Sequence, residues 1–165
     1  MIPAEYDSSP KEIRSFAALQ VVITAVFLIA LFLILGGVSA PRPPWWAMLA
    51  LLVPVAIAAW FAERVWTRTP SLDPETDEEE QRRRAVAIFA GQTVRRLAIC
   101  QVPVILTILV TFVAPWGAWP LVVAAVPAVA LLAWETTPTL HSTSLTEVLL
   151  DADGAQSGLV EAFKR

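Results

Sequence analysis

The chain alternates between long apolar runs and short polar blocks. The apolar runs cover residues 16–38, 45–62, 97–114 and 119–134. About 20 apolar residues, rising 1.5 Å each in an α-helix, are enough to cross a hydrocarbon core of ~30 Å. The pattern therefore predicts an all-α integral membrane protein with four transmembrane helices, the fourth so short that it needs its flanking residues.

Aromatic and charged residues support these spans and orient them. All seven tryptophans fall at the ends of apolar runs, where indole rings prefer the headgroup level. Eleven of the twelve Lys and Arg residues lie in the N-terminal segment, the loop before residue 97 or the tail, and Arg42 stands alone on the other side. By the positive-inside rule these segments are cytoplasmic, so both termini lie inside. The excess of arginine over lysine and the abundance of alanine and valine are typical of a high-GC bacterium, and we expect a multi-pass protein of the bacterial inner membrane.

The two halves of the chain share a pattern. Trp46 precedes Pro54 by the same eight residues that separate Trp119 from Pro127, and a Gln-Val pair begins at both Gln20 and Gln101. Each half would cross the membrane twice and return to the same side. We therefore expect two parallel-repeat hairpins related by an axis along the membrane normal.

Residues 67–96 form the polar block between the second and third spans. Thr76-Asp77-Glu78-Glu79 has the pattern of a capping box, and three glutamates at 78–80 precede three arginines at 82–84 at the favourable four-residue spacing. No helix breaker follows before Pro103. We predict one helix from about residue 76 to 113 that extends into the cytosol and carries an apolar patch (Ala85, Val86, Ile88, Phe89), which the tail, lipid or another protein must cover.

The tail, residues 135–165, is expected to be cytoplasmic and to form two short amphipathic helices. Ser144-Leu145-Thr146-Glu147 has a second capping-box pattern, an Asp153-Gly154 turn follows, and Leu159, Val160 and Phe163 mark the last helical segment.

A few polar residues within the spans are candidate contacts. Gln20 and Gln101, at similar depth, could bond each other or line a polar pocket, and Thr24 and Thr107 could extend a polar track, although such groups more often join helices. Pro54, Pro103 and Pro127 each remove a backbone donor and are candidate kinks. No ionisable residue lies within any span, which disfavours proton-coupled transport.

Charged residues near the cytoplasmic boundary are candidate contacts for lipid headgroups or partner proteins. They are Arg82, Arg83, Arg84, Arg95, Arg96 and Glu135. His141 and Cys100 have no metal-ligand neighbours at suitable spacing, and no phosphate-binding or dinucleotide motif occurs. We therefore expect no catalytic residues, no cofactor and no metal site, and the net charge of -3 disfavours nucleic acid.

Three functions remain open on the sequence. The first is a non-catalytic accessory or assembly subunit of a larger membrane complex, which docks through its spans and cytoplasmic amphipathic helices. The second is a small carrier or channel protomer with a pathway near Gln20 and Gln101. The third is an interfacial lipid-modifying enzyme. The expected partners are the lipid bilayer and either other membrane subunits or further copies of the chain.

Overall fold

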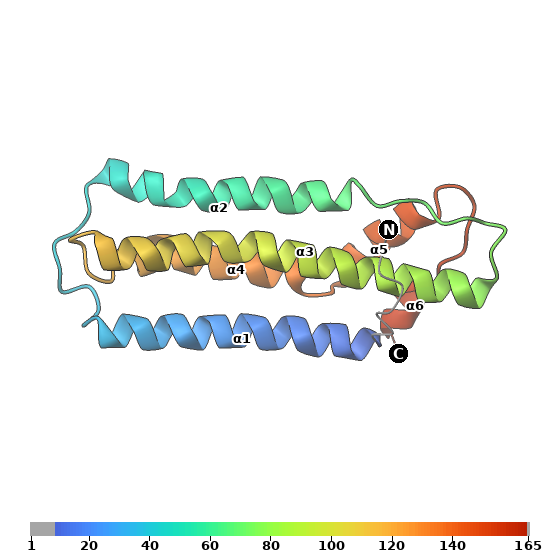
Figure 1. Ribbon diagram of the computed structural model, residues 1–165, viewed down its shortest axis with the longest axis horizontal. Coiled ribbons are helices and arrows are strands. Elements are labelled where there is room, and N and C mark those ends of the chain that lie inside the picture. Colours follow the sequence, from blue (N-terminus) through green and yellow to red (C-terminus); the bar gives the residue numbers. More distant parts are fainter. Residues whose placement is uncertain (1–8, 165) are drawn as a thin grey trace.

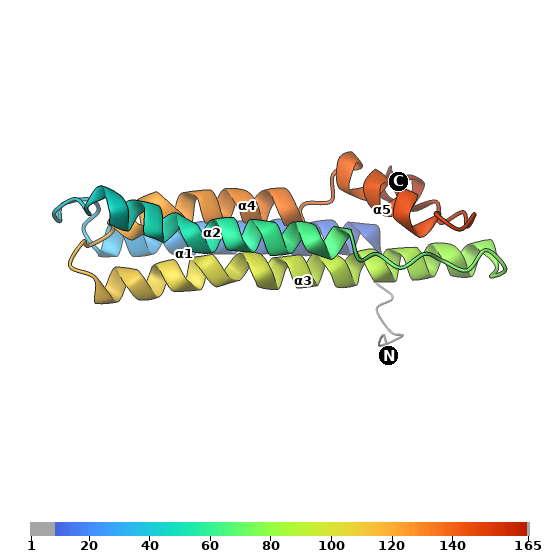
Figure 2. The same ribbon diagram turned by 90° about the horizontal axis from the view of Figure 1, so that it is seen from above.

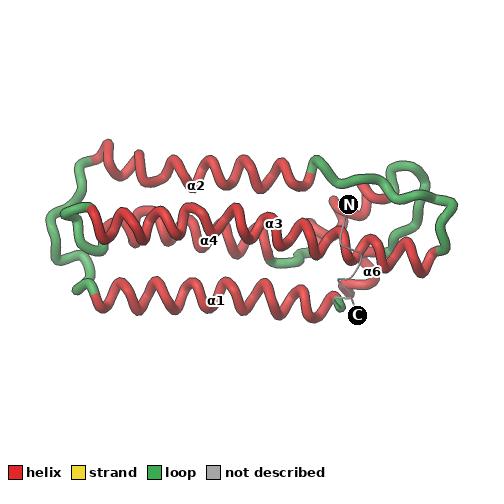
Figure 3. Tube along the Cα trace, viewed as in Figure 1, coloured by secondary structure: helices red, strands yellow, loops and turns green. Residues whose placement is uncertain are grey.

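The computed structural model describes residues 9–164, and every regular element in that part of the chain is helical (Figures 1 and 3). Ser9 caps the first helix with a capping box that was not predicted from the sequence, in which the side chains of Ser9 and Glu12 each accept from the other's backbone N–H. The elements are α1 (Pro10–Ile34), α2 (Trp45–Trp66), α3 (Glu78–Val113), a π-helix η1 (Leu121–Ala125), α4 (Val126–Thr136), α5 (Leu140–Leu150) and α6 (Leu159–Lys164).

Three helices, α1, α2 and α3, are long and apolar enough to cross a membrane. The fourth apolar run is different. Its helical part, Leu121–Thr136, meets the same criteria only together with α5, from which it is bent by 50°. The structure therefore supports three to four spans, and the fourth rests on a segment that is short for a ~30 Å core.

The four bundle helices are arranged as a diamond. Figure 1 shows α1 and α2 on opposite sides of the pair formed by α3 and α4, and Figure 2 shows α3 and α4 on opposite sides of the other two. Buried alanines let the backbones approach closely: Ala58 and Ala62 on α2, Ala124 on η1 and Ala128 on α4. Because α1 and α2 do not pack as a hairpin, the predicted repeat is not confirmed.

The connections after α1 and α3 meet at one end of the bundle, which we call the loop end (residues 35–44 and 114–118). Trp119 Nε1 donates a hydrogen bond of 3.0 Å to the carbonyl oxygen of Ala40. Gly117 has a φ of +55°, and a Cβ on it would lie 2.8 Å from Cβ of Ala40. Glycine at this position therefore allows both the turn and the close approach of the two loops.

Two glycine substitutions should move stability in opposite directions. Gly117→Ala is expected to lower the free energy of unfolding by about 1–2 kcal/mol, because alanine is strained at positive φ and meets Ala40. Gly91→Ala, in the interior of α3 with no atom near its added Cβ, is expected to raise it by about 0.5–1 kcal/mol. Thermal unfolding in detergent measures both, and shifts of the same sign would contradict this account.

At the opposite end, which we call the tail end, α5 and α6 pack on the first turns of α3 (Figure 2). Phe89 of α3 lies 5.0 Å from Phe163 of α6, measured between ring centroids. Leu150, Leu159 and the linker residue Leu72 are buried in the same cluster, which we call the tail-end core. The apolar patch expected on α3 is therefore covered by the chain's own tail and linker.

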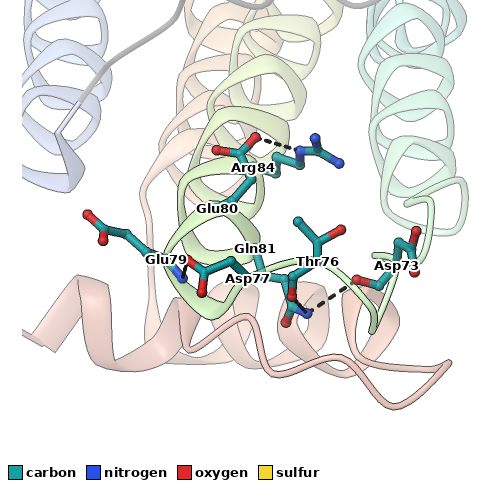
Figure 4. A network of polar contacts seen from close by, with 7 residues as sticks. All are labelled: Asp73, Thr76, Asp77, Glu79, Glu80, Gln81 and Arg84. Atoms are coloured by element: carbon teal, nitrogen blue, oxygen red, sulfur yellow. Dashed lines mark hydrogen bonds and ion pairs between the residues drawn. The ribbon is translucent and has the colours of Figure 1, made fainter.

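A single glutamine ties these segments together. Gln81 is 4% exposed, and its amide nitrogen lies within 3.3 Å of the carbonyl oxygens of Asp73 and Thr76 in the linker (Figure 4). The carbonyl oxygen of Pro74 lies 3.3 Å from the same nitrogen. Its Oε1 accepts a 2.9 Å bond from the backbone N–H of Gln156 in the tail. Both the amide nitrogen and the amide oxygen of Gln81 therefore have hydrogen-bond partners, and these bonds hold the linker and the tail on α3.

Two predicted helix starts are shifted. The N-cap of α3 is Asp77, whose carboxylate accepts from the N–H of Glu79, rather than Thr76. Helix α5 begins after Thr139, which forms its box with Ser142, rather than at Ser144. The turn around Gly154 and the last helix are confirmed.

Candidate functional site

Arg96 occupies the centre of a buried polar cluster where the bundle meets the tail-end core. The side chain is 1% exposed, and its guanidinium carbon lies 3.5 Å from the ring centroid of Trp66 on α2. Its Nη1 donates a 2.8 Å bond to the carbonyl oxygen of Glu135 on α4. One arginine on α3 therefore joins three helices.

The sequence predicted Arg96 as a contact for lipid headgroups or partner proteins, and its burial corrects that expectation. Glu135 lies in the last turn of α4, where backbone carbonyls have no partner within the helix. A cation at this terminus satisfies the carbonyl and also interacts favourably with the helix dipole. Trp66 supplies a π-face on which the guanidinium can stack while it is removed from water.

Glu135 is also withdrawn from solvent, at 8% exposure. Its carboxylate interacts with the side chain of Trp66 and with the charge of Arg96. Sequence reasoning found no local basic partner for Glu135, because Arg96 lies 39 residues earlier. Packing of α4 on α3 supplies one.

Gln92 extends the cluster toward the linker. Its Nε2 donates to Oγ1 of Thr69 at 2.8 Å, and that hydroxyl donates to the carbonyl oxygen of Trp66 at 2.7 Å. The Oε1 atom of Gln92 is buried and has no hydrogen-bond partner within residues 9–164. Gln92 and Thr69 were not singled out from the sequence, and Trp66 was predicted only as one of the tryptophans at the headgroup level. The four-residue spacing of Gln92 and Arg96 is the one local signal that could have pointed to a shared helix face.

The polar residues within the apolar part of the bundle form direct contacts. Gln101 Nε2 donates to Oγ1 of Thr24 at 3.0 Å, so Gln101 bonds α1 through Thr24 rather than through Gln20. Thr107 donates to the carbonyl oxygen of Pro103 at 2.7 Å, one turn earlier in α3. These bonds join helices or satisfy a helix's own backbone.

The three candidate kink prolines have different surroundings. Pro54 and Pro103 lie inside α2 and α3, and both helices continue through them. Pro127 directly follows the π-helix η1, and the backbone is helical on both sides of it, so it lies within a continuous helical segment next to an irregular turn.

The remaining arginines lie at the surface of α3. Arg84 pairs with Glu80 at 2.8 Å, as the four-residue spacing predicted. Arg82 lies against Gly158 of the tail, and Arg83 and Arg95 are exposed. Because exposed ion pairs contribute about 0.2–1 kcal/mol at most, the pair of Arg84 with Glu80 adds little to stability.

No protein family, curated protein or solved structure matches the chain.

The arrangement is suited to holding elements together. Across residues 9–164, no three His, Cys, Asp or Glu side chains are grouped so that they could hold a metal ion. Arg96 is stacked and bonded to a backbone carbonyl. The cluster thus fastens α2, α3 and α4 to one another next to the tail-end core.

Proposed function

We propose that the chain is a non-catalytic accessory or assembly subunit of a larger bacterial membrane complex. In this proposal α4 is the fourth span, and the linker, the first turns of α3 and the tail lie in the cytoplasm. The observation that carries the proposal concerns the first turns of α3, which extend beyond the four-helix bundle. Contacts with the linker and tail hold this part of the helix on one side, and charged residues are exposed on the other.

Rigidity comes from the contacts on the covered side of α3. Gln81 bonds the linker and the tail, Phe89 packs on Phe163, and Arg96 fastens the helix to α2 and α4. A binding surface that is already ordered loses little conformational entropy when a partner docks.

The open side of α3 carries Arg84, Gly91 and Arg95, which are exposed and fall on one face at helical spacing. A Cβ added to Gly91 would have nothing within 4 Å, so another helix could approach the backbone there. Arg95 would pair with carboxylates of that helix, and Arg84 could do the same with the donors that its exposed pair with Glu80 leaves unused. We call Arg84, Gly91 and Arg95 the arginine face and propose an acidic segment of another subunit as its partner.

The chain's own tail and linker cover the apolar patch on α3, and this changes which surface is proposed for docking. The sequence left the tail, lipid or another protein as possible covers of the patch and predicted docking through the spans and the cytoplasmic amphipathic helices. The tail and linker pack on the patch, so those helices are already engaged within the chain. Docking is now proposed through the arginine face and the lipid-facing sides of the spans. The carrier alternative gains no support, because Gln101, Thr24 and Thr107 bond each other or their own backbone.

Charge reversal on the arginine face tests the proposal. A tagged chain would be purified in mild detergent, and copurifying membrane proteins would be quantified for the wild type and for Arg84→Glu/Arg95→Glu. We expect at least about tenfold less partner with the double variant, because like charges would then face each other. Lys11→Glu/Arg68→Glu, with the same change of charge away from the face, should retain the partner.

Two results would sink the proposal. One is a wild-type chain that elutes without any other membrane protein. The other is equal loss of the partner in both double variants, which would indicate an effect of net charge alone.

A further inference from the structure

An apolar groove runs between α1 and the segment formed by η1 and α4. Its volume is about 380 Å³, and hydrocarbon side chains line it, among them Ala25 and Phe32 from α1 and Val122 and Val126 from the other wall. Pockets of 300–1,000 Å³ are typical of sites for small molecules. The groove lies in the half of the bundle toward the loop end.

The groove coincides with the irregular part of its second wall. Residues Leu121–Ala125 form a π-helix, in which the N–H of Val126 bonds the carbonyl oxygen of Leu121. π-helical turns are uncommon and occur frequently at functional sites. Here the wide turn places Leu121, Val122 and Ala125 along the groove wall.

The length of the groove distinguishes an acyl chain from a transmembrane helix as its occupant. The α1 wall spans residues 25–32, which is about 11 Å at 1.5 Å per residue. A transmembrane helix of a second copy would need contacts along most of a ~30 Å core, whereas one leaflet is only about half as thick. The groove therefore matches an acyl chain of a lipid in the leaflet at the loop end.

A positive charge stands at the same end. Arg42 is exposed, and its guanidinium carbon lies 5.8 Å from the ring centroid of Trp119, which is within one turn of Val122. Arg42 is the only Lys or Arg between Arg14 and Arg64. No Asp or Glu occurs between Glu12 and Glu63 or between Glu80 and Glu135, so the loop end holds no acid to neutralise Arg42.

We infer that the chain binds one anionic phospholipid, with an acyl chain in the α1–α4 groove and the phosphate at Arg42. The apolar lining of the groove favours a hydrocarbon acyl chain. The guanidinium of Arg42, which no nearby acid neutralises, favours a negatively charged headgroup. This lipid site is independent of the arginine face, which lies on α3 toward the other end of the bundle.

Native mass spectrometry of the full chain, titrated in detergent with phosphatidylglycerol or phosphatidylcholine, tests the site. We expect one phosphatidylglycerol per chain, bound about fivefold more tightly than phosphatidylcholine, and Arg42→Gln should remove that preference. Ala25→Phe, which fills the groove from α1, should weaken both lipids by about tenfold or more. Ala30→Phe, an exposed position on α1 outside the groove, and Arg68→Gln should behave as the wild type.

Three outcomes would overturn the inference. The first is equal affinity for the two lipids in the wild type. The second is loss of lipid in Ala25→Phe and Ala30→Phe alike. The third is a lipid-free dimer that Ala25→Phe dissociates, which would show that a second copy occupies the groove.

Discussion

Replacing Arg96 with alanine is expected to lower the free energy of unfolding by about 3–5 kcal/mol. The substitution leaves the carbonyl oxygen of Glu135 without its 2.8 Å donor and the nearby carboxylate without a cation. It also removes the group stacked 3.5 Å from Trp66. Thermal or denaturant unfolding in detergent gives the measurement.

The neighbouring arginine supplies the control. Arg95 is exposed, so Arg95→Ala should change the free energy of unfolding by no more than about 0.5 kcal/mol. Arg96→Lys should fall between the two, because lysine keeps the charge but cannot stack or donate in the same plane. Equal stabilities of Arg96→Ala and Arg95→Ala would refute the role assigned to the buried guanidinium.

Replacing Phe163 with alanine is expected to detach the tail from α3. Phe163 is 2% exposed and packs on Phe89, and truncation of a buried phenylalanine typically costs about 3–5 kcal/mol. A helix of six residues has little stability without such packing. Amide hydrogens of residues 151–164 should therefore exchange about a hundredfold faster or more, as measured by hydrogen exchange with mass spectrometry.

Phe112→Ala provides the matched substitution on a lipid-facing position. Phe112 is 65% exposed on α3, so its truncation should leave exchange in the tail unchanged. Unchanged exchange in Phe163→Ala as well would mean that α6 is held by contacts other than the tail-end core.

Local sequence patterns predicted a helix well where its start signal, helix propensity and hydrophobic pattern all agreed. Residues 78–113 contain good helix formers, no breaker before Pro103 and a start marked by acids, and one helix forms there. The exact first residue was harder, because Thr76 and Asp77 are both good caps and helix boundaries are uncertain by one or two residues.

The start of α5 was mispredicted for a physical reason. Glu147 completes a capping-box pattern with Ser144, but its carboxylate instead accepts a hydrogen bond from the backbone N–H of Val160 at the start of α6. Because this contact with α6 engages the carboxylate of Glu147, that carboxylate does not accept from the backbone N–H of Ser144 to form a capping box. Thr139 and Ser142 cap α5 in its place.

The candidate site was the least predictable part. An arginine at the edge of an apolar run is normally an interface residue, and nothing local distinguishes Arg95 from Arg96. Burial of Arg96 depends on Trp66 and Glu135, which are distant in sequence and meet only in the packed bundle. A uniformly apolar run likewise gives no sign of the π-helix at residues 121–125.

The diamond arrangement has a consequence for the order in which the chain can assemble. Helices α1 and α2 leave the ribosome first but lie on opposite sides of α3 and α4, so they must remain apart in the membrane until the second half arrives. The guanidinium of Arg14 then bonds the carbonyl oxygen of Phe163, 149 residues later. The first helix is therefore fastened by a contact that can form only after α6 has been synthesised, long after α1 itself.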